Sequence, residues 1–138
     1  MSNAGVLVDT GPLVAFLREA EADHEWAAEK FAELPAPFLT CEPVLAETFF
    51  LVSRQPDGPR RFFDLLGSGL LEVEFSVLSE RETLRKLIRK YEDLPMSLAD
   101  ACLVRLAEKH AGAVVFTLDA HFRIYRKHGR QQIPVIMP

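Results

Sequence analysis

The stretch that decides the fold is Val6-Leu7-Val8-Asp9-Thr10-Gly11-Pro12. Its run of three apolar residues ends at a carboxylate, which is typical of a short buried strand. Pro12 suits the first turn of a helix, so we expect a helix from there to about Ala20. A strand that leads directly into a helix indicates an α/β protein.

The rest of the chain repeats this alternation. Ser79-x-x-Glu82 and Ser97-x-x-Asp100 are capping-box patterns, which open helices. The fold class we predict is therefore α/β, with a parallel sheet covered by helices on both faces. One domain over residues 1–138 is expected, because this length is common for single domains and no long linker interrupts it. Further strands are expected at 38–40, 70–75, 113–118 and 134–137, and further helices at 23–34, 43–53, 57–66, 79–91 and 97–110, with a short one after 119.

Composition excludes several classes of protein. Apolar residues make up 49% of the chain and charged residues 26%, which excludes a disordered chain. Cys41 and Cys102 are too few for a disulfide scaffold or a zinc ribbon, so a reducing cytoplasm is the expected location. No apolar run approaches the ~20 residues of a membrane span, and the N-terminus lacks the basic region of a signal peptide. We therefore expect no membrane association.

The net charge of −4 disfavours a simple electrostatic nucleic-acid binder, which is usually basic. The charge is unevenly distributed, however. Residues 1–52 hold nine acidic and two basic residues, whereas residues 53–138 hold eleven acidic and fourteen basic residues. This split is compatible with an acidic metal site beside a basic rim, and equally with an ordinary solvated surface.

Four carboxylates occupy unusual positions. Asp9 and Asp119 each follow an apolar strand and precede a helix, at the strand ends where α/β proteins bind ligands, although both can also be helix N-caps. Glu47 and Asp100 lie in helical segments with few other charges, so we expect both to be at least partly buried. The alternatives are that Glu47 lies at a polar helix margin and that Asp100 completes the capping box of Ser97.

Carboxylates gathered in one pocket repel one another and favour a cation. Hard oxygen ligands without a nearby cysteine suit Mg²⁺ or Mn²⁺ better than zinc. The spacing of the four acids in the sequence does not by itself bring them together in space.

The order of these motifs resembles that of PIN-domain nucleases, in particular VapC-type toxins. The resemblance covers essentially the whole chain, and the combination of motifs is specific although no single one is. It rests on LVDTGPLVA at 7–15, DHEWA at 23–27, PVLAE at 43–47, LPMSLADA at 94–101 and VFTLD at 115–119, followed by Phe122 and Tyr125.

This resemblance implies a PIN-like three-layer sandwich with a mostly parallel central sheet. It implies a metal-dependent ribonuclease that uses one or two Mg²⁺ or Mn²⁺ ions to hydrolyse RNA, and it also implies a homodimer and a small antitoxin partner. The sequence departs from the family pattern at His121, where many relatives have an acid, and at Glu42, where many have a small or polar residue. The implied catalytic and metal-binding residues are Asp9, Glu47, Asp100 and Asp119, with Thr10, Ser97 and Thr117 as supporting polar groups.

RNA binding calls for a positive rim. Arg81, Arg85 and Arg89 recur at helical spacing, and Arg123 and Arg126 lie near the C-terminus. Each group is a candidate phosphate contact. The alternative for both is a solvated helix face.

Other functions fit less well. Asp9-Thr10-Gly11 resembles the triplet of aspartic proteases, but those are all-β proteins. A receiver domain would need a lysine near the last strands, and residues 113–119 contain none. The serious alternative is a PIN-fold module that binds RNA or a protein without cleaving, with the apolar helices after Pro43 and Asp57 as an interface.

Overall fold

The computed structural model describes residues 5–138, and its centre is a five-stranded parallel sheet with the order β3–β2–β1–β4–β7. All three residues of β1 are buried, as expected for a strand that pairs on both edges. Leu7 pairs with Leu39 of β2 on one edge and Val115 of β4 on the other. The strands are β1 (Val6–Val8), β2 (Phe38–Thr40), β3 (Leu71–Val73), β4 (Val114–Phe116) and β7 (Val135–Ile136).

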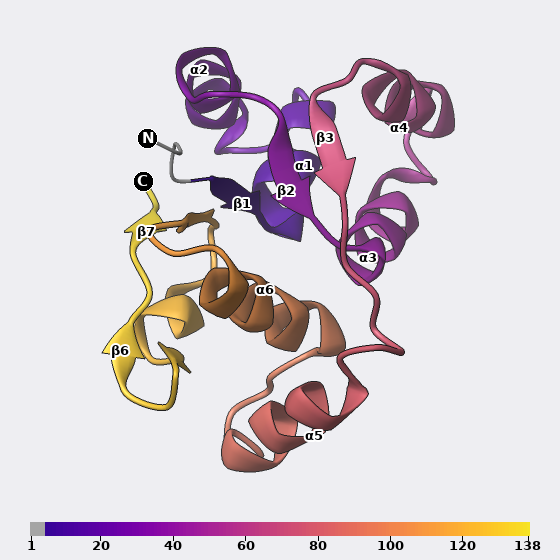
Figure 1. The fold of residues 1–138 in the computed structure, drawn as a ribbon. Coiled ribbons are helices and arrows are strands. Elements are labelled where there is room, and N and C mark those ends of the chain that lie inside the picture. Colours follow the sequence, from indigo (N-terminus) through magenta and orange to yellow (C-terminus); the bar gives the residue numbers. More distant parts are fainter. Residues whose placement is uncertain (1–4) are drawn as a thin grey trace.

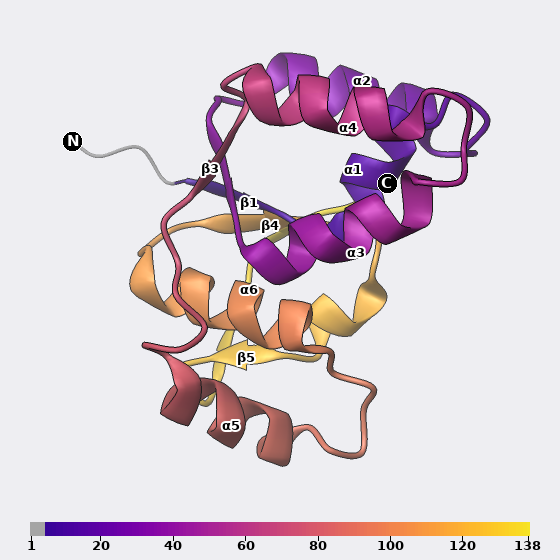
Figure 2. The ribbon, with the colours of Figure 1, turned by 90° about the vertical axis from the view of Figure 1, so that its right-hand side faces the viewer.

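Helices cover both faces of this sheet (Figures 1 and 2). In Figure 2, α6 lies on one side and α1, α2 and α4 on the other, while α5 packs on the outer side of α6. The predicted three-layer α/β architecture is therefore confirmed. The helices are α1 (Thr10–Leu17), α2 (His24–Glu33), α3 (Glu42–Val52), α4 (Gly58–Gly67), α5 (Arg81–Lys90) and α6 (Leu98–Lys109), with a short 3-10 helix η1 (Ala120–Arg123). None of them, within residues 5–138, is both long and apolar enough to cross a bilayer.

An aromatic cluster fixes α2 on the sheet. The ring centroid of Phe31 on α2 lies 4.9 Å from that of Phe38 and 5.0 Å from that of Phe116. Trp26 adds an edge-on contact with Phe116 at 5.3 Å. Aromatic pairs at these separations add stabilisation beyond the area that they bury.

The second predicted capping box is present and the first is not. Ser97 Oγ accepts from the N–H of Asp100, and the Asp100 carboxylate accepts from the N–H of Ser97. The prediction at Ser79 was wrong: α5 begins at Arg81, and the N–H of Ser79 donates to Ser76 instead. The C-terminal region also contains an unpredicted antiparallel hairpin, β5 (Arg126–Lys127) and β6 (Gln131–Gln132).

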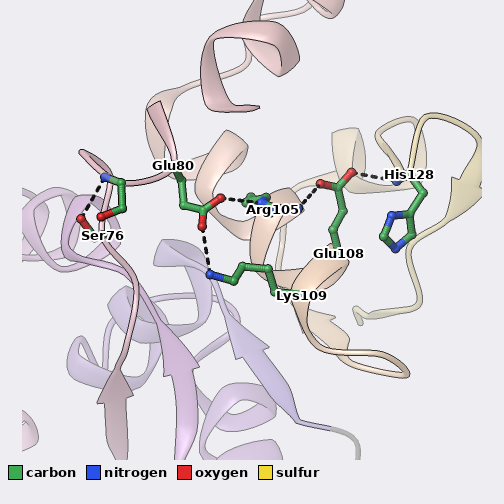
Figure 3. A network of polar contacts seen from close by, with 7 residues as sticks. Ser76, Glu80, Arg105, Glu108, Lys109 and His128 are labelled. Carbon is green, nitrogen blue, oxygen red and sulfur yellow. Dashed lines mark hydrogen bonds and ion pairs between the residues drawn. The ribbon is translucent and has the colours of Figure 1, made fainter. Parts of the chain in front are cut away.

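A polar network lies at the C-terminal end of α6 (Figure 3). Glu80, just before α5, accepts from Arg105 Nε at 2.7 Å and from Lys109 Nζ at 2.9 Å. Arg105 also pairs with Glu108, whose second oxygen accepts from the N–H of His128 near the hairpin. The network therefore joins α5, α6 and the C-terminal region at the end of α6 opposite to Asp100.

Candidate active site

A cavity of about 310 Å³ opens where β1 and β4 end, and all four predicted acids line it. They come from four separate parts of the chain, so the topology brings together residues more than a hundred positions apart. The lining residues are Asp9, Thr10, Gly11, Val14, Ala15, Glu21, Asp23, Glu47, Leu51, Asp100, Leu118 and Asp119.

Asp9 is the most tightly held of these acids. It caps α1, and the residue is only 6% exposed. Its Oδ1 accepts from the N–H of Thr10 at 2.7 Å and its Oδ2 accepts from the hydroxyl of Thr117 at 2.7 Å. Its own N–H donates to Phe116 O, which fixes the backbone to β4. The carboxylate therefore has a defined orientation.

Burial raises the pKa of Asp9 from 3.8 to about 6. The hydrogen bonds from Thr117 and Thr10 act in the opposite direction, because they stabilise the ionised form. The negative charges of Asp100 and Asp119 raise this pKa further. The protein thus holds a carboxylate in a place that disfavours its charge.

Asp100 is 8% exposed and combines two roles. It completes the capping box of α6, and its Oδ2 also accepts from the hydroxyl of Tyr125 at 3.2 Å. Burial raises its pKa, hydrogen bonding to Ser97 opposes the rise, and the charge of Asp119 adds to it. Burial and the neighbouring Asp100 charge raise the pKa of Tyr125, so this phenol stays a hydrogen-bond donor.

Asp119 is the N-cap of η1, so the predicted order of strand, aspartate and helix recurs here. Its N–H donates to Thr117 Oγ1 at 2.9 Å, and its Oδ1 accepts from the N–H of His121 at 2.9 Å. The ring Nδ1 of His121 lies 3.1 Å from the same oxygen. Thr117 therefore connects Asp9 to Asp119. His121 contacts one oxygen of Asp119, Oδ1, through both its backbone N–H and its ring.

The expected burial of Glu47 was wrong, since its side chain is exposed at the mouth of the cavity. The buried face of α3 carries Val44, Thr48 and Val52, and Glu47 lies off that face. The prediction assumed that its neighbour Phe50 belongs to the core, but Phe50 is 70% exposed.

Two acids at the cavity were missed by the sequence reasoning. Glu21 and Asp23 lie in the turn between α1 and α2 and line the same cavity. Glu21 pairs with Arg18 at 3.2 Å, whereas Asp23 makes no side-chain cap bond although it precedes α2. His24 Nδ1 lies 2.7 Å from Ala15 O and ties this turn to α1. The only sequence signal was the acidic composition of residues 19–25.

None of the five predicted RNA-binding arginines is among the residues that line the cavity. Arg81, Arg85 and Arg89 are exposed on α5, and Arg85 pairs with Glu82. Arg123 is exposed at the last position of η1. The guanidinium of Arg126 donates to three backbone carbonyls of residues 123–125, so it serves the local turn.

Comparisons with known proteins agree with this geometry. The PIN domain family model matches residues 6–127. The chain belongs to the PIN domain family. It is 30% identical to the ribonuclease VapC26 of Mycobacterium tuberculosis over 135 residues, which are 95% of this chain and 99% of that protein. The crystal structure of the toxin VapC20 from the same organism, described as cleaving the sarcin–ricin loop, shares the fold, with a TM-score of 0.69 and 22% identity over 83% of this chain and 92% of that one.

The cavity of this PIN domain fits a hard divalent cation by its donor chemistry. Its polar side chains are carboxylates and one hydroxyl, and none is a sulfur or imidazole ligand. Within residues 5–138, no group of three or more acidic, histidine or cysteine side chains is placed so that it could hold a metal ion. An open set of this kind is compatible with Mg²⁺, which usually keeps several waters and takes one or two protein carboxylates.

Proposed function

We propose that this PIN domain is a metal-dependent endoribonuclease that acts in the cytoplasm as the toxin of a toxin–antitoxin pair. The observation that carries the proposal is the cavity at the carboxyl ends of the strands, which Asp9, Glu47, Asp100 and Asp119 all line. The 30% identity to a protein named as a ribonuclease over nearly all of both chains supports the same activity.

In this proposal Asp9 and Asp100 are the principal metal ligands, and Glu47 and Asp119 complete the set. A Mg²⁺ or Mn²⁺ ion held there would lower the pKa of a bound water and would neutralise phosphate charge. The protein's own contribution is to orient the acids: Thr117 and the N–H of Thr10 hold Asp9, and Ser97 and Tyr125 hold Asp100.

The raised pKa of Asp9 and Asp100 supports a cationic occupant. Burial and mutual repulsion disfavour the ionised carboxylates, and a divalent cation reverses both effects. Because water and not the ribose 2′-hydroxyl attacks in this scheme, the products carry a 5′-phosphate and a 3′-hydroxyl. A 2′,3′-cyclic phosphate among the products would contradict it.

The test is cleavage of a mixed pool of structured RNAs with Mg²⁺ or Mn²⁺ by three proteins: wild type, Asp100→Asn and Asp93→Asn. Asp93 is exposed and does not line the cavity, so its variant changes the charge equally without touching the site. Activity in wild type and Asp93→Asn that is lost in Asp100→Asn, and lost with EDTA, would support the proposal. Equal cleavage by all three proteins would indicate a contaminating nuclease.

A non-cleaving binding module would be favoured by a different result. The wild-type protein would then bind RNA in a filter-binding assay but leave every RNA intact with either metal. Circular dichroism of Asp100→Asn is the control for its fold, because the residue also caps α6. An asparagine oxygen can still accept from the N–H of Ser97, so we expect this variant to fold.

An apolar surface on α3 and α4 supports a protein partner, either a second copy of the chain or the antitoxin. Phe50 and Phe63 are 70% and 60% exposed, and Leu51 and Leu66 are also exposed. A groove of about 400 Å³ between these helices is lined mainly by Leu45, Ala46, Phe49, Phe62, Phe63 and Leu66. Exposed apolar groups gathered in this way are typical of interaction surfaces.

A further inference from the structure

The hydroxyl of Thr10 differs from those of the other buried threonines. Thr40 and Thr48 donate to backbone carbonyls, and Thr117 donates to Asp9. Thr10 is 4% exposed, and its Oγ1 is buried without any hydrogen-bond partner in the protein. A buried hydroxyl without a partner is costly, so a group from outside the protein is the natural partner.

The position of Thr10 indicates what this group is. The residue opens α1 and lines the acidic cavity. Its own N–H is used by Asp9, whereas the N–H of Gly11 belongs to the first turn, which has no acceptor within the helix. The positive end of the α1 dipole therefore lies beside the cavity.

The side chains that line the cavity include no other group that binds anions. Its lining residues include no lysine, arginine or histidine, and its remaining polar side chains are carboxylates, which only accept hydrogen bonds when ionised. A phosphodiester oxygen needs donors; among the lining side chains only Thr10 carries one, and the start of α1 adds backbone N–H groups.

Close packing fixes this turn. A Cβ atom built on Gly11 would lie 3.1 Å from the Cβ of Leu118, so the turn lies directly against the segment that leads to Asp119. The donors at the start of α1 are thus held at a constant position relative to the acids. Donors that are held in place before the substrate binds need no reorganisation during the reaction.

We propose that Thr10 Oγ1 and the N-terminus of α1 form a phosphate subsite that binds a non-bridging oxygen of the scissile phosphate. The proposal deepens the ribonuclease function and rests on it. It assigns Thr10 a direct contact with the substrate, in addition to the support that its N–H gives to Asp9.

The test compares wild type, Thr10→Val and Thr10→Ser on an RNA that carries one phosphorothioate, in the Rp or the Sp form, at the bond that wild type cleaves. Valine matches the shape of threonine without the hydroxyl, and serine keeps the hydroxyl. We expect Thr10→Val to cleave the normal phosphate about 10- to 100-fold more slowly, since it loses one hydrogen bond to a charged group, and Thr10→Ser to stay close to wild type.

The decisive result is non-additivity. If the hydroxyl binds one phosphate oxygen, sulfur at that oxygen slows wild type and Thr10→Ser but adds little to the slowing in Thr10→Val. Fully additive effects for both diastereomers would overturn the subsite, as would equal rates for wild type and Thr10→Val.

The other explanation is that the Thr10 hydroxyl serves the cation. Magnesium binding, measured by calorimetry without RNA, distinguishes it from a phosphate contact. We expect equal Mg²⁺ affinity for the three proteins. A weaker affinity in Thr10→Val alone would show that the hydroxyl serves the cation, and it would overturn the phosphate assignment while leaving the ribonuclease function standing. Cleavage of no RNA by wild type would overturn both.

Discussion

Replacing Asp9 with asparagine removes a carboxylate whose ionised form is made costly by burial in the folded protein. The folded-state pKa of Asp9 is about 6 and its ordinary value is 3.8, a difference that corresponds to about 3 kcal/mol. Between these pH values the folded protein binds more protons than the unfolded chain, so the free energy of unfolding falls as the pH rises. About 2 kcal/mol of this loss lies between pH 4 and pH 7.

The measurement is urea unfolding of wild type and Asp9→Asn at pH 4 and pH 7 in metal-free buffer. Asparagine does not titrate, so we expect the stability of wild type relative to the variant to be about 2 kcal/mol lower at pH 7 than at pH 4. The comparison between pH values cancels the constant cost of the altered bond to Thr117, and acids that are not coupled to Asp9 titrate alike in both proteins. Added Mg²⁺ should stabilise wild type at pH 7 much more than the variant.

A relative stability that does not change with pH, or that changes in favour of wild type as the pH rises, would refute the reasoning. It would mean that the bonds from Thr10 and Thr117 outweigh the burial of Asp9. The fold of the variant is checked by near-UV circular dichroism at both pH values.

Three further changes test other parts of the molecule. Tyr125→Phe removes a donor from Asp100, so we expect roughly 10-fold weaker Mg²⁺ binding by calorimetry; unchanged binding would make that bond dispensable. Glu80→Gln breaks the pair with Arg105, and because this pairing lowers the pKa of Glu80 from its ordinary value of 4.5, the cost of about 1 kcal/mol in urea unfolding at pH 7 should diminish as the pH falls below that ordinary value. Phe63→Ser removes an exposed ring from the apolar surface, so the mass by light scattering should shift toward one chain if this surface joins two copies, and an unchanged dimer mass would place that interface elsewhere.

The sequence determined the main elements because their signals are local. The apolar run 6–8, the capping box at Ser97 and the apolar run before Asp119 each depend on residues adjacent in the chain. Parallel strands end at a common edge of the sheet, but only the folded sheet makes β1 and β4 neighbours and so brings Asp9 and Asp119 together. The burial of Asp100 followed from the apolar residues around it on α6.

The tertiary structure alone decided what each side of a helix faces. Glu47 and Phe50 are exposed because α3 buries a different stripe, a choice made by packing against α1 and α6 and not by the composition of α3. The turn between α1 and α2 brings Glu21 and Asp23 to the cavity, and no local pattern encodes that approach. The unpaired hydroxyl of Thr10 also became visible only in three dimensions, because hydrogen-bond satisfaction depends on neighbours that the chain supplies from a distance.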